Sequence, residues 1–146
     1  MLAELTIGEL MTRDVISVLP DAKLNAAQEI MEEYGIRHLP VVEHGKLVGI
    51  VSKGDIREAR PSDATTLSVW EVNYLWDTIK VREVMTEKVL IVSPEQPLLE
   101  ALRLMVARKF SSLPVVTDGV LVGIITETDI FNKLIALGES EQVTAS

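Results

Sequence analysis

The chain contains one sequence unit twice, in two copies offset by 74 residues. When positions 9–56 are laid over positions 83–130 without a gap, 20 of the 48 residue pairs are identical. The string Leu-Pro-Val-Val occurs at 39–42 and 113–116, and Leu-Val-Gly-Ile occurs at 47–50 and 121–124. Repetition over this length indicates two copies of one structural unit.

The repeats divide the chain into four predicted parts. We expect a first repeat at 6–60, a helical bridge at 61–79 and a second repeat at 80–137. The remaining residues, 138–146, are polar, and we expect them to form a flexible tail that frays.

The first repeat predicts the element order β-α-β-β-α. A brief strand is expected over 15–18, where β-branched residues cluster. A helix is expected next, because apolar residues recur at helical spacing until Gly35 ends the run. Two apolar runs, 39–43 and 46–52, flank His44-Gly45 and predict a β-hairpin, which a second helix follows.

The second repeat predicts the same order, with Pro97 near the start of its first helix and Asp118-Gly119 at its hairpin. A short helix ending near Met11 is expected before the first strand, because Thr6 and Glu9 fit a capping box. One repeat alone would have a thin core. We therefore expect an α+β fold of two pseudo-symmetric β-α-β-β-α repeats, packed sheet against sheet and joined by a helical bridge.

The bridge predicts a helix over 67–79, a stretch without Pro or Gly. Its apolar residues form two stripes on nearly opposite sides, Val72, Leu75, Trp76 and Ile79 in one and Leu67, Trp70 and Tyr74 in the other. A helix with two apolar sides tends to be buried on both. One side can cover its own repeat, and we expect the other to pair with a second copy in a homodimer. The alternative is a bridge folded entirely into its own monomer.

Composition excludes several classes of function. The chain has 146 residues and a formal net charge of -8, which repels the nucleic-acid backbone. It contains no Cys, so it has no disulfide framework and no thiolate nucleophile or metal ligand. Its apolar runs are too short for a membrane span, and the first cation is Arg13, which does not fit a signal peptide. We expect a cytoplasmic protein with neither nucleic acid nor membrane as a partner.

The candidate site lies where the second strand of each hairpin passes into a helix. Ser52 stands three residues before Asp55, and Thr126 stands three residues before Asp129. This spacing fits a capping box, which satisfies free amides at a helix start and needs no further role. It also fits nucleotide binding, because a helix start attracts phosphate. A carboxylate one turn along can accept hydrogen bonds from both hydroxyls of a ribose.

The duplicated Leu-Pro-Val-Val, Leu-Val-Gly-Ile and Ser/Thr-x-x-Asp strings resemble a tandem pair of CBS (cystathionine β-synthase) domains, also called a Bateman module. The resemblance covers residues 6–136. The bridge string at 61–67, followed by Asn73-Tyr-Leu, is similar to bacterial stand-alone CBS proteins and to the front part of acetoin-utilisation CBS proteins. Those proteins often carry a C-terminal ACT domain, which we do not expect here because the sequence stops at Ser146.

The resemblance implies a regulatory module that binds adenosine-containing ligands in clefts between the two repeats. The ligands are mostly AMP, ADP or ATP, and S-adenosylmethionine in some members. In nucleotide-binding members the Asp of the Ser/Thr-x-x-Asp string holds the ribose, a role that falls here to Asp55 and Asp129, with Ser52 and Thr126 as the hydroxyls.

The resemblance also implies phosphate contacts from basic residues just before the Leu-Pro pair. The first repeat has Arg37 and His38 there, and the second has Ser111 and Ser112. Because charge-assisted hydrogen bonds are stronger than neutral ones, the two clefts should differ in affinity, and phosphate binding should depend mainly on Arg37. The second helix start shows the same asymmetry, with Lys53 and Arg57 in the first repeat against Glu127 and Phe131 in the second. The adenine is expected among apolar strand residues: Ile16, Ile50 and Ile124.

Three functions remain as alternatives. The first is a non-catalytic sensor in which an adenine nucleotide shifts the geometry of a dimer and an effector protein reads the change. An S-adenosylmethionine sensor is a variant of this. The second is a ligand-free dimeric scaffold in which the Asp residues only cap helices. The third is an enzyme, but no nucleophile, acid–base pair or metal-ligand set stands out. We expect no catalytic residue, no metal and no obligatory cofactor.

Overall fold

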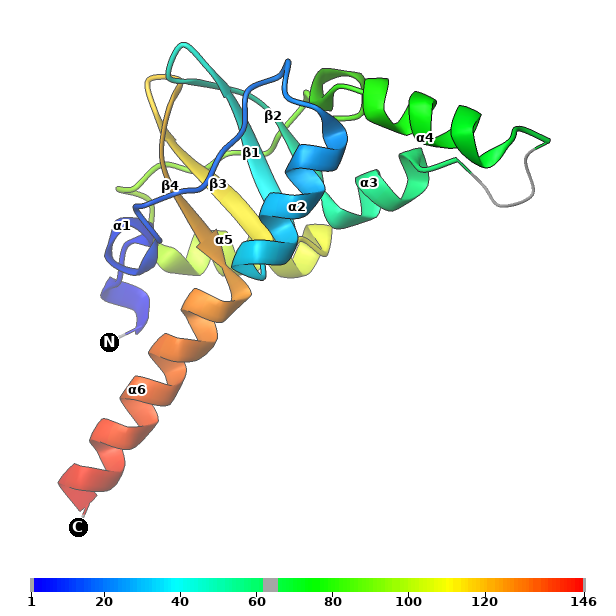
Figure 1. The fold of residues 1–146 in the computed structure, drawn as a ribbon. Helices are drawn as coiled ribbons and strands as arrows, with labels where there is room; N and C mark the ends of the chain where they lie inside the picture. Colours follow the sequence, from blue (N-terminus) through cyan, green and yellow to red (C-terminus); the bar gives the residue numbers. More distant parts are fainter. Residues whose placement is uncertain (1, 62–65, 146) are drawn as a thin grey trace. The chain divides into compact units, whose positions relative to one another are not determined.

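The computed structural model describes residues 2–61 and 66–145, so the bridge residues 62–65 and Ser146 lie outside the described residues. The chain forms two compact units. The central unit consists of residues 16–89, and the terminal unit consists of residues 1–15 together with 90–146. Each contains helices and an antiparallel β-hairpin (Figure 1), which confirms the α+β class.

The central unit carries the hairpin of the first repeat. Its elements are α2 (Leu24–Tyr34), β1 (His38–Glu43), β2 (Lys46–Ser52), α3 (Lys53–Ala59), α4 (Val69–Thr78) and the 3-10 turn η2 (Val81–Glu83). The predicted hairpin is confirmed, with His44 and Gly45 at φ 53° and 80°. Two successive residues at positive φ match the twist of a two-residue hairpin turn.

The terminal unit carries the hairpin of the second repeat. Its elements are η1 (Leu2–Glu4), α1 (Ile7–Leu10), α5 (Leu98–Arg108), β3 (Ser112–Thr117), β4 (Val120–Thr126) and α6 (Glu127–Ala145). Asp118 and Gly119 form its turn at φ 51° and 82°. At the start of α1 the predicted capping box is confirmed, because the Thr6 N–H donates to Glu9 Oε2 at 2.8 Å.

The compact units do not follow the repeat boundaries. Residues 1–15 begin the first repeat but pack beside the hairpin of the second, and residues 80–89 begin the second repeat but pack beside the hairpin of the first. In the terminal unit the N–H of Thr12 donates to the carbonyl of Ile124 at 2.8 Å, and the N–H of Ile124 donates back at 3.0 Å. Thr86 and Ile50 form the same reciprocal pair in the central unit. We call the segments 1–15 and 80–89 the leaders of the first and second repeats. Each leader therefore completes the unit that holds the hairpin of the other repeat.

Close packing of the leaders explains the glycine in each Leu-Val-Gly-Ile string. A Cβ on Gly123 would lie 2.6 Å from Sδ of Met11 and 3.0 Å from the carbonyl oxygen of Thr12. A Cβ on Gly49 would lie 2.7 Å from Sδ of Met85. Such distances leave no room for a side chain, so glycine is required where the leader crosses the strand.

Two sequence predictions are wrong in detail. Residues 15–18 form no strand, because Val18 makes only an isolated parallel bridge, to Val41, and its neighbours pair with nothing in register. The tail predicted to fray is instead helical through Ala145, as the last turns of α6. Residues 139–145 contain no Pro, and Gly138 alone costs a helix only about 1 kcal/mol.

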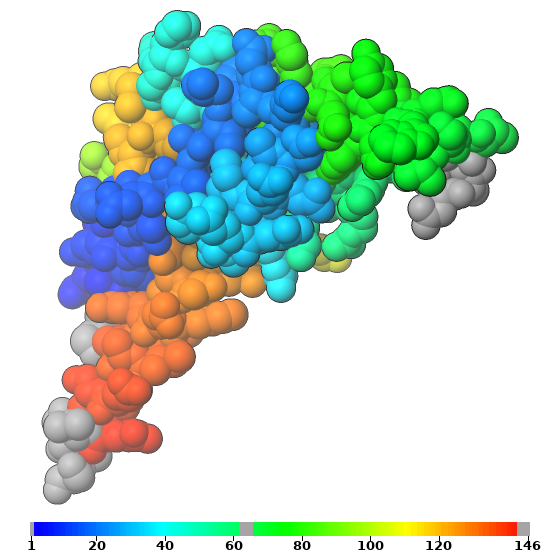
Figure 2. Space-filling model, in the orientation of Figure 1, coloured from blue at the N-terminus to red at the C-terminus, as the bar shows by residue number. Residues whose placement is uncertain are grey.

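The bridge helix is two residues shorter at its start than predicted and buries one side. Trp76 and Ile79 pack against the core of the central unit, and Asn25 Nδ2 donates to Asp77 Oδ1 at 2.9 Å, tying α4 to α2. Trp70 is 85% exposed and Tyr74 is 70% exposed, and Figure 2 shows the green atoms of α4 at the surface. Leu75, which shares its predicted stripe with Trp76 and Ile79, is 43% exposed, so the buried side of α4 is narrower than that stripe.

The ends of α2 and α5 give a stability prediction. Gly35 ends α2 at φ 65°, and Lys109 ends α5 at φ 57°. The left-handed conformation costs a residue with a Cβ about 1–2 kcal/mol, which exceeds the roughly 0.4–1 kcal/mol that the greater chain freedom of Gly costs. We therefore expect Lys109→Gly to raise the free energy of unfolding by about 0.5–1 kcal/mol in urea denaturation. Lys109→Ala keeps the Cβ and is the control; an equal gain from Ala would contradict the explanation.

Candidate functional site

Each Ser/Thr-x-x-Asp string closes a capping box at the point where the hairpin ends. In the central unit the N–H of Ser52 donates to Asp55 Oδ2 at 2.9 Å, and the N–H of Asp55 donates to Ser52 Oγ at 3.1 Å. In the terminal unit the corresponding distances for Thr126 and Asp129 are 2.9 and 3.2 Å. The predicted capping role is confirmed, and it holds each carboxylate in a defined position.

The two carboxylates differ in how many partners they already have. Asp129 Oδ1 accepts from the hydroxyl of Thr12 at 2.9 Å, and Oδ2 accepts from the hydroxyl of Thr126 at 2.9 Å. Within the described ranges, Asp55 Oδ1 has no hydrogen-bond partner. Since each carboxylate oxygen can accept about two hydrogen bonds, both Asp residues keep acceptor capacity, and Asp55 keeps more of it.

Both copies of the repeat match one family model. The CBS domain model matches residues 7–62 and 81–136, which together exceed half of the chain. The chain belongs to the CBS-domain family. The two matches form the tandem pair that the repeated strings predicted.

Solved CBS-pair structures share the fold over nearly the whole chain. A Vibrio cholerae protein assigned to acetoin utilization (AcuB) is 35% identical with a TM-score of 0.80, over 94% of this chain and 96% of that one. CBSX2 solved in complex with AMP is 30% identical with a TM-score of 0.74, over 92% and 98%. The CBS pair of MJ0100, solved with 5'-methylthioadenosine and S-adenosyl-L-methionine, is 26% identical with a TM-score of 0.72, over 90% and 96%.

Curated relatives include longer proteins in which CBS domains form one part. Inosine-5'-monophosphate dehydrogenase of Korarchaeum cryptofilum is 35% identical over 122 residues, which are 83% of this chain and 22% of the relative. Chloroplastic CBSX1 of Arabidopsis thaliana is 32% identical over 92% of this chain and 66% of its own length. The chain spans 22–25% of the length of the first three curated relatives.

Several other predicted site residues of the first CBS repeat lie together in the central unit. Arg37 is exposed just before β1, and its carbonyl accepts from the N–H of Lys53 at 2.8 Å. His38 pairs in register with Ser52 across the hairpin. Ile50 pairs with Pro40 two residues further along, and Ile16 is partly buried against the core. Arg37, His38, Ser52 and Asp55 therefore gather at one end of the β1–β2 hairpin.

The corresponding end of the second repeat contains an unusual hydroxyl. Ser112 pairs in register with Thr126, and Ile124 pairs with Pro114. Ser112 is 8% exposed, and its Oγ is buried with no hydrogen-bond partner among the described residues. A buried hydroxyl without a partner is costly, at about 1–3 kcal/mol.

Sequence reasoning missed Thr12, whose hydroxyl bonds to Asp129. The signal was present, because Met11-Thr12 recurs as Met85-Thr86. No group of three or more His, Cys, Asp or Glu residues in the described ranges could hold a metal ion. None of the described helices is long and apolar enough to cross a membrane.

Proposed function

We propose that this chain is a non-catalytic CBS-pair sensor that binds one adenosine-containing ligand at each Ser/Thr-x-x-Asp string. The observation that carries the proposal is the carboxylate that a capping box holds at the start of α3 and again at the start of α6. The ligands of similar CBS pairs support it, since AMP, 5'-methylthioadenosine and S-adenosylmethionine all contain a ribose. A carboxylate with two acceptor oxygens suits the paired hydroxyls of that sugar.

The capping geometry gives a physical reason for ribose binding here. Asp55 and Asp129 are half-buried, and each is held by backbone N–H groups that also need a partner at the helix start. A carboxylate held in place before the ligand arrives loses little conformational freedom on binding, which favours affinity. In the terminal unit the buried hydroxyl of Ser112, which has no partner among the described residues, lies on the strand beside Thr126, and a polar ligand or water near it would lower the cost of its burial.

We expect Arg37 to discriminate phosphorylated from unphosphorylated ligands. Arg37→Gln should weaken AMP binding to the central unit by about tenfold, because a charge-assisted contact to phosphate is lost. Adenosine lacks the phosphate, so its affinity should change by less than about twofold. Isothermal titration with both ligands measures the difference. An equal loss for AMP and adenosine would show that Arg37 acts on folding rather than on phosphate.

The class of ligand is decided by thermal shift. The melting temperature should rise with AMP, ADP or ATP if the chain is a nucleotide sensor, and with S-adenosylmethionine or 5'-methylthioadenosine if it is a sensor of those compounds. An unchanged melting temperature with all five at millimolar concentration would favour the ligand-free scaffold. A ligand shifts the equilibrium between two dimer geometries only by the difference in its affinity for them. In a sensor, an effector protein must then distinguish the two geometries.

We further propose that the outer side of α4 joins two chains in a homodimer. Trp70 and Tyr74 lie one turn apart on α4 and are largely exposed. Two such aromatic residues on one helix are typical anchors of a protein interface. Trp70→Ser combined with Tyr74→Ser should raise the dimer dissociation constant at least about a hundredfold, measured by sedimentation equilibrium. Leu19→Ser, at an exposed apolar residue elsewhere in the same unit, is the control. A dimer that persists unchanged in the double variant would contradict this interface.

A further inference from the structure

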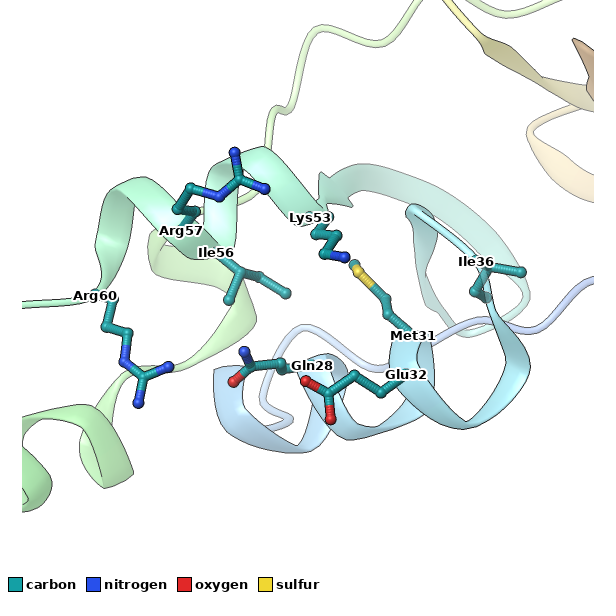
Figure 3. Close-up of a pocket in the computed structure, with 8 residues that line it drawn as sticks. All are labelled: Gln28, Met31, Glu32, Ile36, Lys53, Ile56, Arg57 and Arg60. Atoms are coloured by element: carbon teal, nitrogen blue, oxygen red, sulfur yellow. The ribbon is translucent and has the colours of Figure 1, made fainter.

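The central unit contains a pocket of about 210 Å³ between α2 and α3. It is lined by Gln28, Met31, Glu32, Ile36, Lys53, Ile56, Arg57 and Arg60 (Figure 3). Met31 and Ile56 are buried and give the pocket an apolar floor. Ligand pockets for drug-sized molecules measure about 300–1,000 Å³, so this one suits a smaller molecule.

Positive charge dominates the rim of this pocket. Three of its lining residues, Lys53, Arg57 and Arg60, are basic and one, Glu32, is acidic. Figure 3 shows the guanidinium of Arg57 turned away from α2, so Lys53 and Arg60 are the cations that border the space facing Gln28 and Glu32. Within the described part of the chain, the ion pairs involve other residues, Asp21 with Lys80 and Arg82. None of the pocket cations is therefore ion-paired among the described residues, although the guanidinium of Arg60 lies over the ring of Trp76, in a chain whose formal net charge is -8.

The pocket is distinct from the proposed ribose site, although both use α3. Successive residues of an α-helix are about 100° apart around its axis. Lys53, Ile56 and Arg60 therefore fall on one side of α3, and Asp55 falls on the opposite side. A molecule in the pocket contacts the side of α3 that packs against α2, while Asp55 is directed elsewhere.

The charged residues of this pocket do not recur in the second repeat. At the positions 74 residues later, Lys53, Arg57 and Arg60 are replaced by Glu127, Phe131 and Leu134. Glu32 and Gln28 are replaced by Val106 and Leu102. Only the floor is retained, since Met31 corresponds to Met105 and Ile56 to Ile130. The basic rim is a property of the first repeat alone.

We propose that this pocket binds a small organic anion, with its phosphate or carboxylate beside Lys53 or Arg60 and a short apolar chain against Met31 and Ile56. Lys53 and Arg60 border different ends of the pocket in Figure 3, and either one can donate charge-assisted hydrogen bonds to such a group. The apolar floor favours an anion with a hydrocarbon part over a free inorganic ion. The proposal does not depend on ribose binding, because the pocket lining does not include Arg37, His38, Ser52 or Asp55.

Trp76 provides a direct reporter of the pocket. The guanidinium carbon of Arg60 lies 5.4 Å from the centre of the Trp76 ring. In a Trp70→Phe background Trp76 is the remaining tryptophan, so an anion that draws Arg60 towards the pocket changes its fluorescence. We expect hexyl phosphate to give a saturable change in the fluorescence of Trp76. Inorganic phosphate lacks the apolar chain and tests its contribution to affinity. Hexanoate has a carboxylate in place of the phosphate and tests the contribution of the acidic group. Neutral 1-hexanol should give no comparable response.

Charge variants test whether each charged side chain of the pocket attracts or repels the bound anion. Lys53→Gln with Arg60→Gln should weaken hexyl phosphate binding at least about tenfold, because both cations that can hold the acidic group are removed. Glu32→Gln should strengthen binding by about threefold, since a repelling carboxylate is removed, and this variant keeps the test valid if the double variant folds poorly. Asp55→Asn should leave hexyl phosphate binding unchanged, even if it abolishes adenosine binding. The proposal is overturned by a lack of saturable response in the parent protein, by an equal response to 1-hexanol, or by unchanged affinity in the folded charge variants.

Discussion

Asp129→Asn is expected to remove one of two adenosine-ligand sites in each chain, and Asp55→Asn to remove the other. Asn keeps an oxygen that can accept the capping N–H, so the helix start should persist. It loses the negative charge and one acceptor, and hydrogen bonds from the ribose to a charged group are each worth about 1.5–3 kcal/mol. The affinity of the altered site should therefore fall at least about thirtyfold. Isothermal titration should show the number of bound ligands per chain drop from two to one.

Asp118→Asn is the matched control for these variants. It makes the same chemical change in the same unit as Asp129, but in the hairpin turn at the far end of β3 and β4. Asn is well tolerated at that positive φ, so both stability and ligand binding should be preserved. Equal loss of ligand in the control, or full binding in the Asp55 and Asp129 variants, would refute the ribose role.

Deletion of residues 2–15 is expected to unfold the terminal unit even though the second CBS repeat remains intact in sequence. Ile7 is fully buried in that unit's core, and Met11 is 8% exposed within the same core. The leader also makes backbone hydrogen bonds, including Ile7 N–H to Gln96 O at 2.9 Å and Leu98 N–H to Leu5 O at 2.8 Å. Its removal exposes apolar surface and leaves several backbone groups without partners. We expect the free energy lost in this way to exceed the typical stability of a small domain, which is about 5–15 kcal/mol.

A point variant and a peptide test whether the contacts of the leader, rather than the shortening of the chain, account for the loss of stability. Ile7→Ala should lower the free energy of unfolding by about 2–5 kcal/mol in guanidinium denaturation, the usual range for a buried large-to-Ala change. Leu2→Ala, at an exposed position of the same leader, should cost less than about 0.5 kcal/mol. A synthetic peptide of residues 2–15 should restore structure to the deleted chain. Unchanged cooperative unfolding of the deleted chain would show that the leader is dispensable.

The local elements were predictable because each depends on residues close together in the chain. The hairpins follow from His44-Gly45 and Asp118-Gly119, whose two-residue spacing suits a turn at positive φ. The capping boxes follow from the spacing of Thr6 with Glu9 and of Ser52 with Asp55. In these cases local chemistry and the observed structure agree.

The compact units were not predictable from element patterns, because they depend on which leader packs on which hairpin. Both leaders carry the string Glu-x-Met-Thr, at 9–12 and 83–86, so the sequence does not say which leader packs on which hairpin. The paired occurrence of Met-Thr with Leu-Val-Gly-Ile marks the contact, since Gly123 lacks a Cβ where Met11 crosses it. The β-branched residues at 15–18 also led to the prediction of a strand that does not form, because such residues favour strands but cannot supply a partner in register.

The candidate site was predictable in part. The sequence placed Asp55 and Asp129 at helix starts, where the structure has them. It could not show that Thr12 bonds to Asp129, because the two residues are 117 positions apart. Nor could it show the basic pocket, because that pocket depends on the approach of α2 to α3 and on the rotamers of Lys53 and Arg60.

A crystal structure of the protein grown with millimolar AMP, and a second grown with S-adenosylmethionine, would test the ribose assignment most directly. We predict that in at least one of them the sugar hydroxyls lie about 2.5–3.0 Å from the carboxylate oxygens of Asp55 or Asp129. Crystals in which both carboxylates retain only their capping contacts, with the ligand bound elsewhere or absent, would contradict it.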